Sequence, residues 1–323
     1  MHNKSVVILG TGGTIAGTSD SPSDTTGYTA AQLSIRALVH DIPALEAMGH
    51  IVVEQVAQID SKDASFEMWA HLAGRVNHYL AMESVQGVVI THGTDTLEET
   101  AFFLQSILCT DKPVVLTCAM RPATALYPDG PQNLLDAVLT AKQVDARGVL
   151  VVCAGVIHNA KFVQKVHTSR LNAFCSGDAG PIGQIEDNTL KLLQNWPAGS
   201  KISSLQAKEN IAKLIEAKQW PRVEVVLSYA GASGAVVEAL VAQGVQGLVV
   251  AGTGNGTIHH ELEVALLKAM AGGVVVVRAT RCVYGHVTPK TGDKFGESHG
   301  LSPVKARIVL ILRLMALNTE KID

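Results

Sequence analysis

The sequence lacks the features by which several protein classes are recognised. Its net charge is −3, so it has no basic surplus that would bind nucleic acid. It contains no apolar run near the ~18 residues that cross a bilayer, so we expect no membrane partner. The N-terminus runs from a few apolar residues into a glycine loop, without the apolar region and cleavage site of a signal peptide. With Met1 as the natural start, these absences predict a cytoplasmic protein.

Paired cysteines and clustered metal ligands are also missing. The five cysteines are an odd, scattered set without C-x-x-C spacing: Cys109, Cys118, Cys153, Cys175 and Cys282. This pattern argues against a disulfide framework or a zinc site, and we expect most of these thiols to be small buried side chains. His259 and His260 are adjacent and would not face the same way on a helix, which favours a structural role over metal binding.

What is present is typical of a globular α/β protein of two domains. The chain has 323 residues, of which 47% are hydrophobic and 17% charged. Continuous β-branched runs alternate with helix-like stretches, which predicts a mostly parallel sheet covered on both faces. The runs cover residues 6–9, 51–56, 88–90, 114–116, 149–152, 223–227, 248–250 and 274–277. Helices are predicted over 65–82, 97–108 and 132–143.

A break in this alternation predicts the domain boundary. Residues 195–221 contain two Trp-Pro pairs and a charged stretch, and a new apolar run starts at Val223. We therefore predict a larger N-terminal domain over 1–194 with a mostly parallel sheet flanked by helices. A linker over 195–221 then leads to a smaller C-terminal α/β domain over 222–323. Because ligands bind at the carboxyl ends of parallel strands, chemistry is expected just after each apolar run.

The loop after the first apolar run, residues 10–17, is rich in glycine and allows three interpretations. A phosphate could be cradled there, but Ile15 occupies the last slot of a dinucleotide fingerprint and Thr18 stands where a P-loop has lysine. Thr14 could instead be a nucleophile, because the glycines allow close approach of a substrate carbonyl. A threonine in such a loop is also a common turn or capping residue.

Hydroxyls and carboxylates are dense after the third run, in residues 91–100. One interpretation is a helix N-terminus, with Thr94 or Asp95 as the cap and Glu98 completing a capping box. That interpretation leaves the density of hydroxyls unexplained. Further on, Lys165 lies in a polar segment; lysine is usually solvated, but one buried against a threonine can stay neutral and act as a base.

Taken together, these pieces resemble the bacterial-type L-asparaginase family. The motifs that carry the resemblance are TGGTIAG at 11–17, ITHGTDTLEETAFFL at 90–104, AMRP at 119–122, DGPQNL at 129–134, AGTGNG at 251–256, VRATR at 277–281 and LSPVKAR at 301–307. They run in order over nearly the whole chain. The resemblance implies hydrolysis of free L-asparagine to L-aspartate and ammonia, without metal or organic cofactor, by a homotetramer built from dimer pairs.

The resemblance also implies roles for single residues. Thr14 matches the nucleophile that forms a β-aspartyl ester, and Tyr28 matches the lid tyrosine that hydrogen-bonds it. Thr94, Lys165 and Asp95 match a second triad, in which the lysine acts through Thr94 to activate the water that releases aspartate. The residues that match substrate contacts are Asp95 for the α-ammonium, Ser61 for the α-carboxylate, Asn255 in the second domain, and backbone N–H groups near Thr94 and Ala119 for the oxyanion.

The sequence departs from the family pattern in two places. Lys62 follows Ser61 where many relatives have glutamine; it either lies beside the carboxylate site or points to solvent. After Arg281 the segment looks shorter, and its one glutamate, Glu297, comes too late to match the glutamate that relatives extend into a neighbouring subunit. Asn255, in contrast, matches the family's second-domain asparagine; because relatives that accept glutamine well often have serine there, the resemblance implies a preference for asparagine as substrate.

Several alternatives remain open at this point. A glutaminase-asparaginase with broad amide specificity would also accept a substrate that is longer by one methylene. Sequence alone ranks two such similar substrates poorly. An amidotransferase subunit acting on charged tRNA would be expected to carry an extra domain and a basic surface. From another class, a non-catalytic nucleotide-binding module would use the glycine loop alone.

Overall fold

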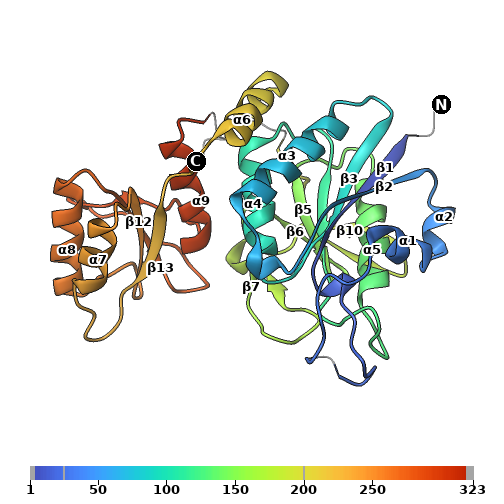
Figure 1. Ribbon diagram of the computed structural model, residues 1–323, viewed down its shortest axis with the longest axis horizontal. Coiled ribbons are helices and arrows are strands. Elements are labelled where there is room, and N and C mark those ends of the chain that lie inside the picture. The colour runs from blue at the N-terminus through green and yellow to red at the C-terminus, as the bar shows by residue number, and fades with distance from the viewer. Residues whose placement is uncertain (1–3, 25, 199–200, 318–323) are drawn as a thin grey trace. The chain divides into compact units, whose positions relative to one another are not determined.

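The computed structural model describes residues 4–24, 26–198 and 201–317, and divides the chain into two compact units, Met1–Ile215 and Glu216–Asp323. Each unit has its own sheet with helices packed on it (Figure 1). Residues 199 and 200 of the predicted linker lie outside the described part, as do the two ends of the predicted domains. The predicted linker also contains a helix, α6 (Ser204–Glu216), in which Asn210 donates a hydrogen bond to the Ile107 carbonyl of the first unit (3.4 Å).

The first unit is built on an eight-stranded sheet in the order β10-β9-β6-β5-β4-β3-β1-β2. Five strands are parallel: β1 (Ser5–Gly12), β2 (Ile51–Ile59), β3 (Val85–Thr91), β4 (Val114–Thr117) and β5 (Val149–Cys153). Three antiparallel strands extend the β5 edge: β6 (Val156–Asn159), β9 (Gly183–Glu186) and β10 (Thr189–Leu192). The predicted mostly parallel sheet is confirmed.

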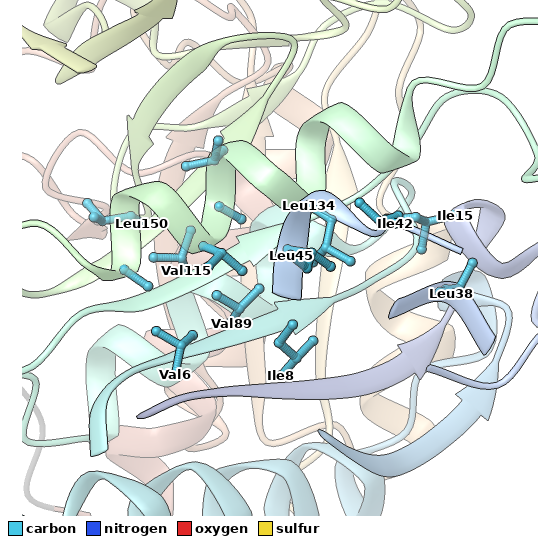
Figure 2. Packing of buried hydrophobic residues seen from close by; sticks show 14 of the residues in the cluster. Val6, Ile8, Ile15, Leu38, Ile42, Leu45, Val89, Val115, Leu134 and Leu150 are labelled. Carbon is cyan, nitrogen blue, oxygen red and sulfur yellow. The ribbon is translucent and has the colours of Figure 1, made fainter. Parts of the chain in front are cut away.

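Helices cover both faces of this sheet, which is why its strands are apolar without alternation. On one face, α1 (Ile35–His40) and α5 (Gly130–Ala141) bury a cluster that includes Ile8, Val89 and Val115 (Figure 2). On the other face lie α3 (Phe66–Leu80) and α4 (Leu97–Ile107), where the Trp69 and Phe103 rings stack at 4.8 Å. A short helix, α2 (Ala44–Ala47), follows α1.

The strand order marks the edge of the sheet at which a ligand site is expected. Strands run outward from β1 in both directions, to β2 on one side and to β3, β4 and β5 on the other. The carboxyl ends of β1 and β3 therefore flank the position where the winding reverses, and ligands bind at such switch points in open α/β sheets. The loops that leave β1 and β3 are the glycine loop and the hydroxyl-rich segment singled out in the sequence.

The second unit has its own parallel sheet in the order β11-β12-β13-β14. Its strands are β11 (Val223–Leu227), β12 (Gly247–Gly252), β13 (Val275–Thr280) and β14 (Gly296–Glu297). Its helices are α7 (Ala235–Ala242), α8 (His260–Ala271) and α9 (Pro303–Leu314). The predicted smaller α/β domain is confirmed as a fold.

The cysteines differ in burial. Cys118 and Cys153 are buried, but Cys109 and Cys175 are half-buried and Cys282 is exposed, so the prediction that most thiols are buried is wrong. Hydropathy alone does not separate a strand end from a loop, and the exposed cysteine lies in a loop after β13. Across the described residues, every helix is too short or too polar to traverse a bilayer.

Candidate active site

The loops after β1 and β3 touch through their glycine backbones. Gly13 has φ +82°, and a Cβ atom there would lie 2.3 Å from the Cα of Gly93. A Cβ on Gly93 would in turn lie 2.5 Å from the Oγ of Ser61. Both positions therefore exclude a side chain. This contact brings the residues next to each glycine, Thr14 and Thr94, to one place beside Ser61.

Three amide groups of the glycine loop are bonded within the loop or to β2. The Gly13 N–H donates to the Ile59 carbonyl (2.9 Å), and Ala16 N–H and Gly17 N–H donate to the carbonyls of Gly13 and Thr14 (3.2 and 2.8 Å). A phosphate cradle needs such N–H groups aimed at the ligand. The loop is therefore explained by close backbone approach and does not favour a nucleotide.

Thr14 starts a short 3₁₀ helix, Thr14–Ala16, and is 6% exposed. Its Oγ1 lies 2.7 Å from the phenol oxygen of Tyr28. The helix cap is Gly13, so the Thr14 side chain has no capping role. Tyr28 is held in place because Thr18 and Thr29 exchange two backbone hydrogen bonds at the base of its loop (2.9 and 2.8 Å).

A second hydroxyl cluster forms around Lys165. Its ammonium donates to Thr94 Oγ1 at 2.8 Å and to Asp95 Oδ1 at 2.6 Å. The Lys165 side chain is 20% exposed, whereas the Asp95 side chain is 54% exposed. Lys165 lies on β7 (Gln164–Lys165), which pairs with β8 (Phe174–Cys175) in a separate two-stranded sheet. The lysine is thus turned inward onto Thr94, and Asp95 keeps an accessible edge.

Ser61 connects this cluster to the end of β2. It lies in a 3₁₀ helix, Ser61–Asp63, and its Oγ accepts the Asp95 N–H at 3.2 Å. Its carbonyl accepts the Thr96 hydroxyl at 2.7 Å. Thr96 is the N-cap of α4, so the predicted cap at Thr94 or Asp95 is wrong. The physical reason is that Ser61 binds the Asp95 N–H and Lys165 binds the side chains of Thr94 and Asp95, so these polar groups are not available to cap the helix.

Lys62 takes the solvent-facing alternative. Its side chain is 60% exposed and forms an ion pair with the neighbouring Asp63. Such an exposed pair contributes little to stability.

The loop after β4 is fastened by the DGPQNL motif. The Asp129 carboxylate accepts the N–H groups of Met120 and Arg121, each at 2.9 Å. Asn133 donates to the Cys118 carbonyl (2.9 Å) and accepts the Ala154 N–H (2.9 Å). Two side chains of one helix start therefore fix the backbone on both sides of Ala119.

Ala119 itself is fully buried and lies against the glycine loop. The position that a Cβ on Gly130 would occupy is 2.9 Å from Ile15 Cγ1 and 3.5 Å from the Ala119 Cβ. Ala119 is thus separated from Ile15, the neighbour of Thr14, by one small residue. Any larger residue at position 130 would force these two loops apart.

A buried histidine supports the same region. His92 is 1% exposed; its Nδ1 lies 2.8 Å from the Gly93 carbonyl, and its Nε2 lies 3.0 Å from the Thr100 hydroxyl. Trp69 Nε1–H donates to that hydroxyl at 2.9 Å. Burial lowers the pKa of His92 to about 4, so the ring is neutral near pH 7, with Nδ1 donating and Nε2 accepting.

Asn255 lies in the second unit, in the turn after β12. Its Oδ1 accepts the Thr288 N–H at 2.8 Å, which ties the turn to the segment that follows β13. Gly256 has φ +76°, and a Cβ there would lie 2.9 Å from Val287. Close by in sequence, His259 caps α8 by accepting the Glu261 N–H (3.3 Å), in keeping with the structural role expected for it.

Sequence reasoning missed several supporting side chains. It assigned no role to His92 or Asp129, and it placed Glu98 in a capping box, whereas Glu98 accepts the backbone N–H of Lys165 at 2.5 Å. One signal was available: Asp129 directly precedes Gly-Pro at a helix start, a position from which a carboxylate can reach backbone N–H groups. The Glu98 contact joins residues 67 apart and has no local signal.

The site therefore holds two threonines with different partners. Thr14 meets a phenol, Thr94 meets an ammonium and a carboxylate, and the hydroxyl of Ser61 lies next to them. Within the described residues, no three His, Cys, Asp or Glu side chains are grouped as metal ligands. Such a set can activate a hydroxyl for attack on a carbonyl, activate water afterwards, and hold a charged small molecule.

The chain is similar to known proteins over nearly its whole length. Residues 5–198 match the model "Asparaginase, N-terminal", and residues 222–322 match "Glutaminase/Asparaginase C-terminal domain". L-asparaginase 2 of Escherichia coli is 39% identical, covering 96% of this chain and 88% of the relative. The glutaminase-asparaginase of Pseudomonas fluorescens is 35% identical, covering 98% and 88%.

Similarity extends to a solved structure. The crystal structure of a probable cytoplasmic L-asparaginase from Campylobacter jejuni superimposes with a TM-score of 0.88 at 38% identity, covering 99% of this chain and 96% of that one. Both units of the fold are thus shared with this solved structure. The chain belongs to the bacterial-type asparaginase family.

Proposed function

We propose that this protein is an amidohydrolase that converts free L-asparagine to L-aspartate and ammonia. The observation that carries the proposal is the meeting of the β1 and β3 loops at the switch point of the sheet. There Thr14 lies against Tyr28, and Thr94 lies against Lys165 and Asp95. Family membership of the whole chain supports the same reaction.

In the first half-reaction, Thr14 Oγ1 attacks the carboxamide carbon. A threonine hydroxyl is a poor nucleophile until a neighbour takes its proton, and Tyr28 at 2.7 Å is placed to relay it: the phenol oxygen takes the Thr14 proton as the phenol hydrogen passes to the leaving nitrogen. The C–N bond breaks, the leaving nitrogen takes a proton, and ammonia departs from a β-aspartyl ester of Thr14. Backbone N–H groups near Thr94 and Ala119 would stabilise the oxyanion, each typically by ~3 kcal/mol.

In the second half-reaction, water attacks the ester with help from Thr94 and Lys165. In the resting structure Lys165 donates to both Thr94 and Asp95, so it must first give a proton to the departing ammonia, which leaves as ammonium, before it can accept one. Arrival of the substrate α-ammonium at Asp95 would favour that loss, because two cations would then face one carboxylate. The water then gives one proton through Thr94 to Lys165 and its other proton to the Thr14 oxygen as the ester C–O bond breaks, and aspartate is released.

Substrate would be held by its two charged ends. The exposed edge of Asp95 suits the α-ammonium, and the Ser61 hydroxyl suits the α-carboxylate. Asn255 would contribute from the second unit. A pocket that grips both ends of a free amino acid places the amide on Thr14 and excludes peptides.

The direct test is ammonia release from L-asparagine by the purified protein, with Thr14→Ala and Thr14→Ser as variants. We expect Thr14→Ala to lose nearly all turnover and Thr14→Ser to keep part of it, because a hydroxyl remains. Full activity of the alanine variant would disprove the assignment of Thr14 as the nucleophile. A thermal shift with nucleotide but not with aspartate would instead support the binding-module alternative.

Broad amide specificity is the second candidate. It is favoured by the 35% identity to a protein named glutaminase-asparaginase. One methylene is worth only about 1–3 kcal/mol in discrimination, so either preference is physically reachable. Measuring kcat/KM for asparagine and glutamine decides between them; comparable values would establish the broader enzyme.

Assembly and location complete the proposal. We infer a homotetramer built as a dimer of dimers, in the cytoplasm, in line with the description of the Campylobacter jejuni protein as cytoplasmic. Light scattering after size exclusion should give four times the 34.1 kDa chain mass. A monomer in solution, or release of the protein by periplasmic extraction of its host, would contradict the respective part.

A further inference from the structure

Glu98 makes a contact that a helix cap does not explain. Its Oε2 accepts the backbone N–H of Lys165 at 2.5 Å. The N-cap of α4 is Thr96, whose hydroxyl is bonded to the Ser61 carbonyl, so the capping box expected from the sequence is absent at this helix start. A half-buried carboxylate in the first turn of α4 is therefore directed at the chain carrying the catalytic lysine.

Lys165 needs such an anchor because its strand is minimal. The strand β7 has two residues and pairs on one side only, with β8. Next to it, Val166 N–H donates to the Ala173 carbonyl at 2.8 Å. The Glu98 carboxylate takes the place of a further strand at Lys165, and a hydrogen bond to an ionised acceptor is roughly twice as strong as a neutral one.

The geometry shows one five-residue segment holding the lysine at both ends. Thr94 and Asp95 bond its Nζ at 2.8 and 2.6 Å, and Glu98 bonds its backbone nitrogen at 2.5 Å. We infer that Glu98 is a positioning residue that fixes the Lys165 backbone so that Nζ reaches Thr94. The catalytic consequence rests on the proposed function; the structural one does not.

A simpler role for Glu98 makes a different prediction. A carboxylate in the first turn of a helix interacts favourably with the helix dipole, typically by 0.3–1 kcal/mol. That role would change the melting temperature slightly and leave turnover and the position of Lys165 unchanged. Turnover measured together with stability therefore separates the two roles.

The variants are Glu98→Ala, which removes the acceptor, and Glu98→Gln, which keeps an acceptor oxygen without charge. The control is Glu67→Gln, an exposed carboxylate in the first turn of α3. We expect Glu98→Ala to lower kcat by about 10- to 100-fold with KM within about threefold, since small misplacements of catalytic groups have such costs. Glu98→Gln should lose less, and Glu67→Gln should resemble wild type.

A double-mutant cycle with Lys165→Met gives the sharper test. If Glu98 acts through Lys165, Glu98→Ala should reduce the activity of Lys165→Met by less than about twofold. Fully additive losses, or a Glu98→Ala enzyme with unchanged kcat, would overturn the inference. Should Glu98→Ala not fold, the same cycle is run with Glu98→Gln.

The structural part is tested independently of the reaction. A crystal structure of Glu98→Ala should show Lys165 Nζ withdrawn from Thr94; an unmoved Nζ would overturn the inference whatever the substrate is. In contrast, a wild-type protein that releases no ammonia from asparagine or glutamine would refute the proposed function. The two failures are thus distinguishable.

Discussion

The two threonine clusters of the site occupy equivalent positions, at the ends of β1 and β3, yet their chemistry differs. Thr14 and Thr94 are equally buried, at 6% exposure. Thr14 has a neutral phenol as its partner at 2.7 Å, whereas Thr94 has an ammonium at 2.8 Å backed by a carboxylate. Burial therefore does not distinguish the two hydroxyls, but the charge next to them does.

This difference is the basis for proposing that the two clusters serve different half-reactions. A neutral partner near Thr14 leaves room for a substrate whose own charges are bound elsewhere. A charged relay near Thr94 suits the activation of water, which needs a stronger base once the amide nitrogen has left. If the clusters serve separate steps, removing the partner of each threonine should slow a different half-reaction.

Removing the charged partner should have the largest effect. We expect Lys165→Met to lower kcat by about 10³-fold, within the range that a positioned acid or base contributes. Because release of aspartate is the step affected, covalent enzyme should accumulate during turnover, as measured by intact-mass spectrometry after acid quench. Lys191→Met, an exposed lysine on β10, is the control. Loss of kcat without any covalent species would contradict the proposal that Lys165 and Thr94 serve hydrolysis of the ester.

Acidification should weaken the support of the Thr94 loop. In the folded protein the pKa of His92 is lowered by burial to about 4, against 6.5 when it is exposed. The unfolded chain thus binds the extra proton first, so this contribution is complete above pH 6.5 and declines as the pH falls towards 4. The loss is about 3 kcal/mol.

Urea unfolding between pH 4 and 7 measures this loss. His92→Gln should reduce by one the number of protons bound on unfolding across this pH range, whereas the exposed His40→Gln should leave that number unchanged. An unchanged slope in His92→Gln would show that the ring is not the neutral, buried group described.

Removing the neutral partner should have the smallest effect of the three. Tyr28→Phe deletes the hydroxyl next to Thr14, and we expect kcat/KM to fall by roughly 10- to 100-fold, at the low end for a proton-transfer group. No covalent enzyme should accumulate, because formation of the ester is the slowed step. Tyr127→Phe, exposed in the loop after β4, is the control. Accumulation of ester in Tyr28→Phe would reverse the assignment of the clusters.

The parallel core could be predicted from sequence because its signal is local. Seven of the eight apolar runs fall within strands β1 to β5, β11 and β12, and the eighth begins one residue before β13; the three predicted helices match α3, α4 and α5 to within two residues at each end. Strands buried on both faces need continuous apolar residues, and this requirement is visible in any short window. The antiparallel strands β6, β9 and β10 were not predicted.

Their signals are weaker for physical reasons. Each has four residues, and the turn between β9 and β10 places Asp187 and Asn188 at positive φ, where glycine is the usual marker. The site shows the same limit. Motifs identified the residues proposed to react, but the contact of Glu98 with Lys165 joins residues 67 apart and depends on tertiary packing that no spacing encodes.

The central claim is that Thr14, and not Thr94, carries the acyl group. The most direct measurement is acid quench of Lys165→Met during turnover of asparagine, followed by peptide mapping of the covalent adduct. The account predicts an aspartyl ester on the peptide that contains Thr14, absent from Thr14→Ala. An ester on the peptide that contains Thr94 would contradict it.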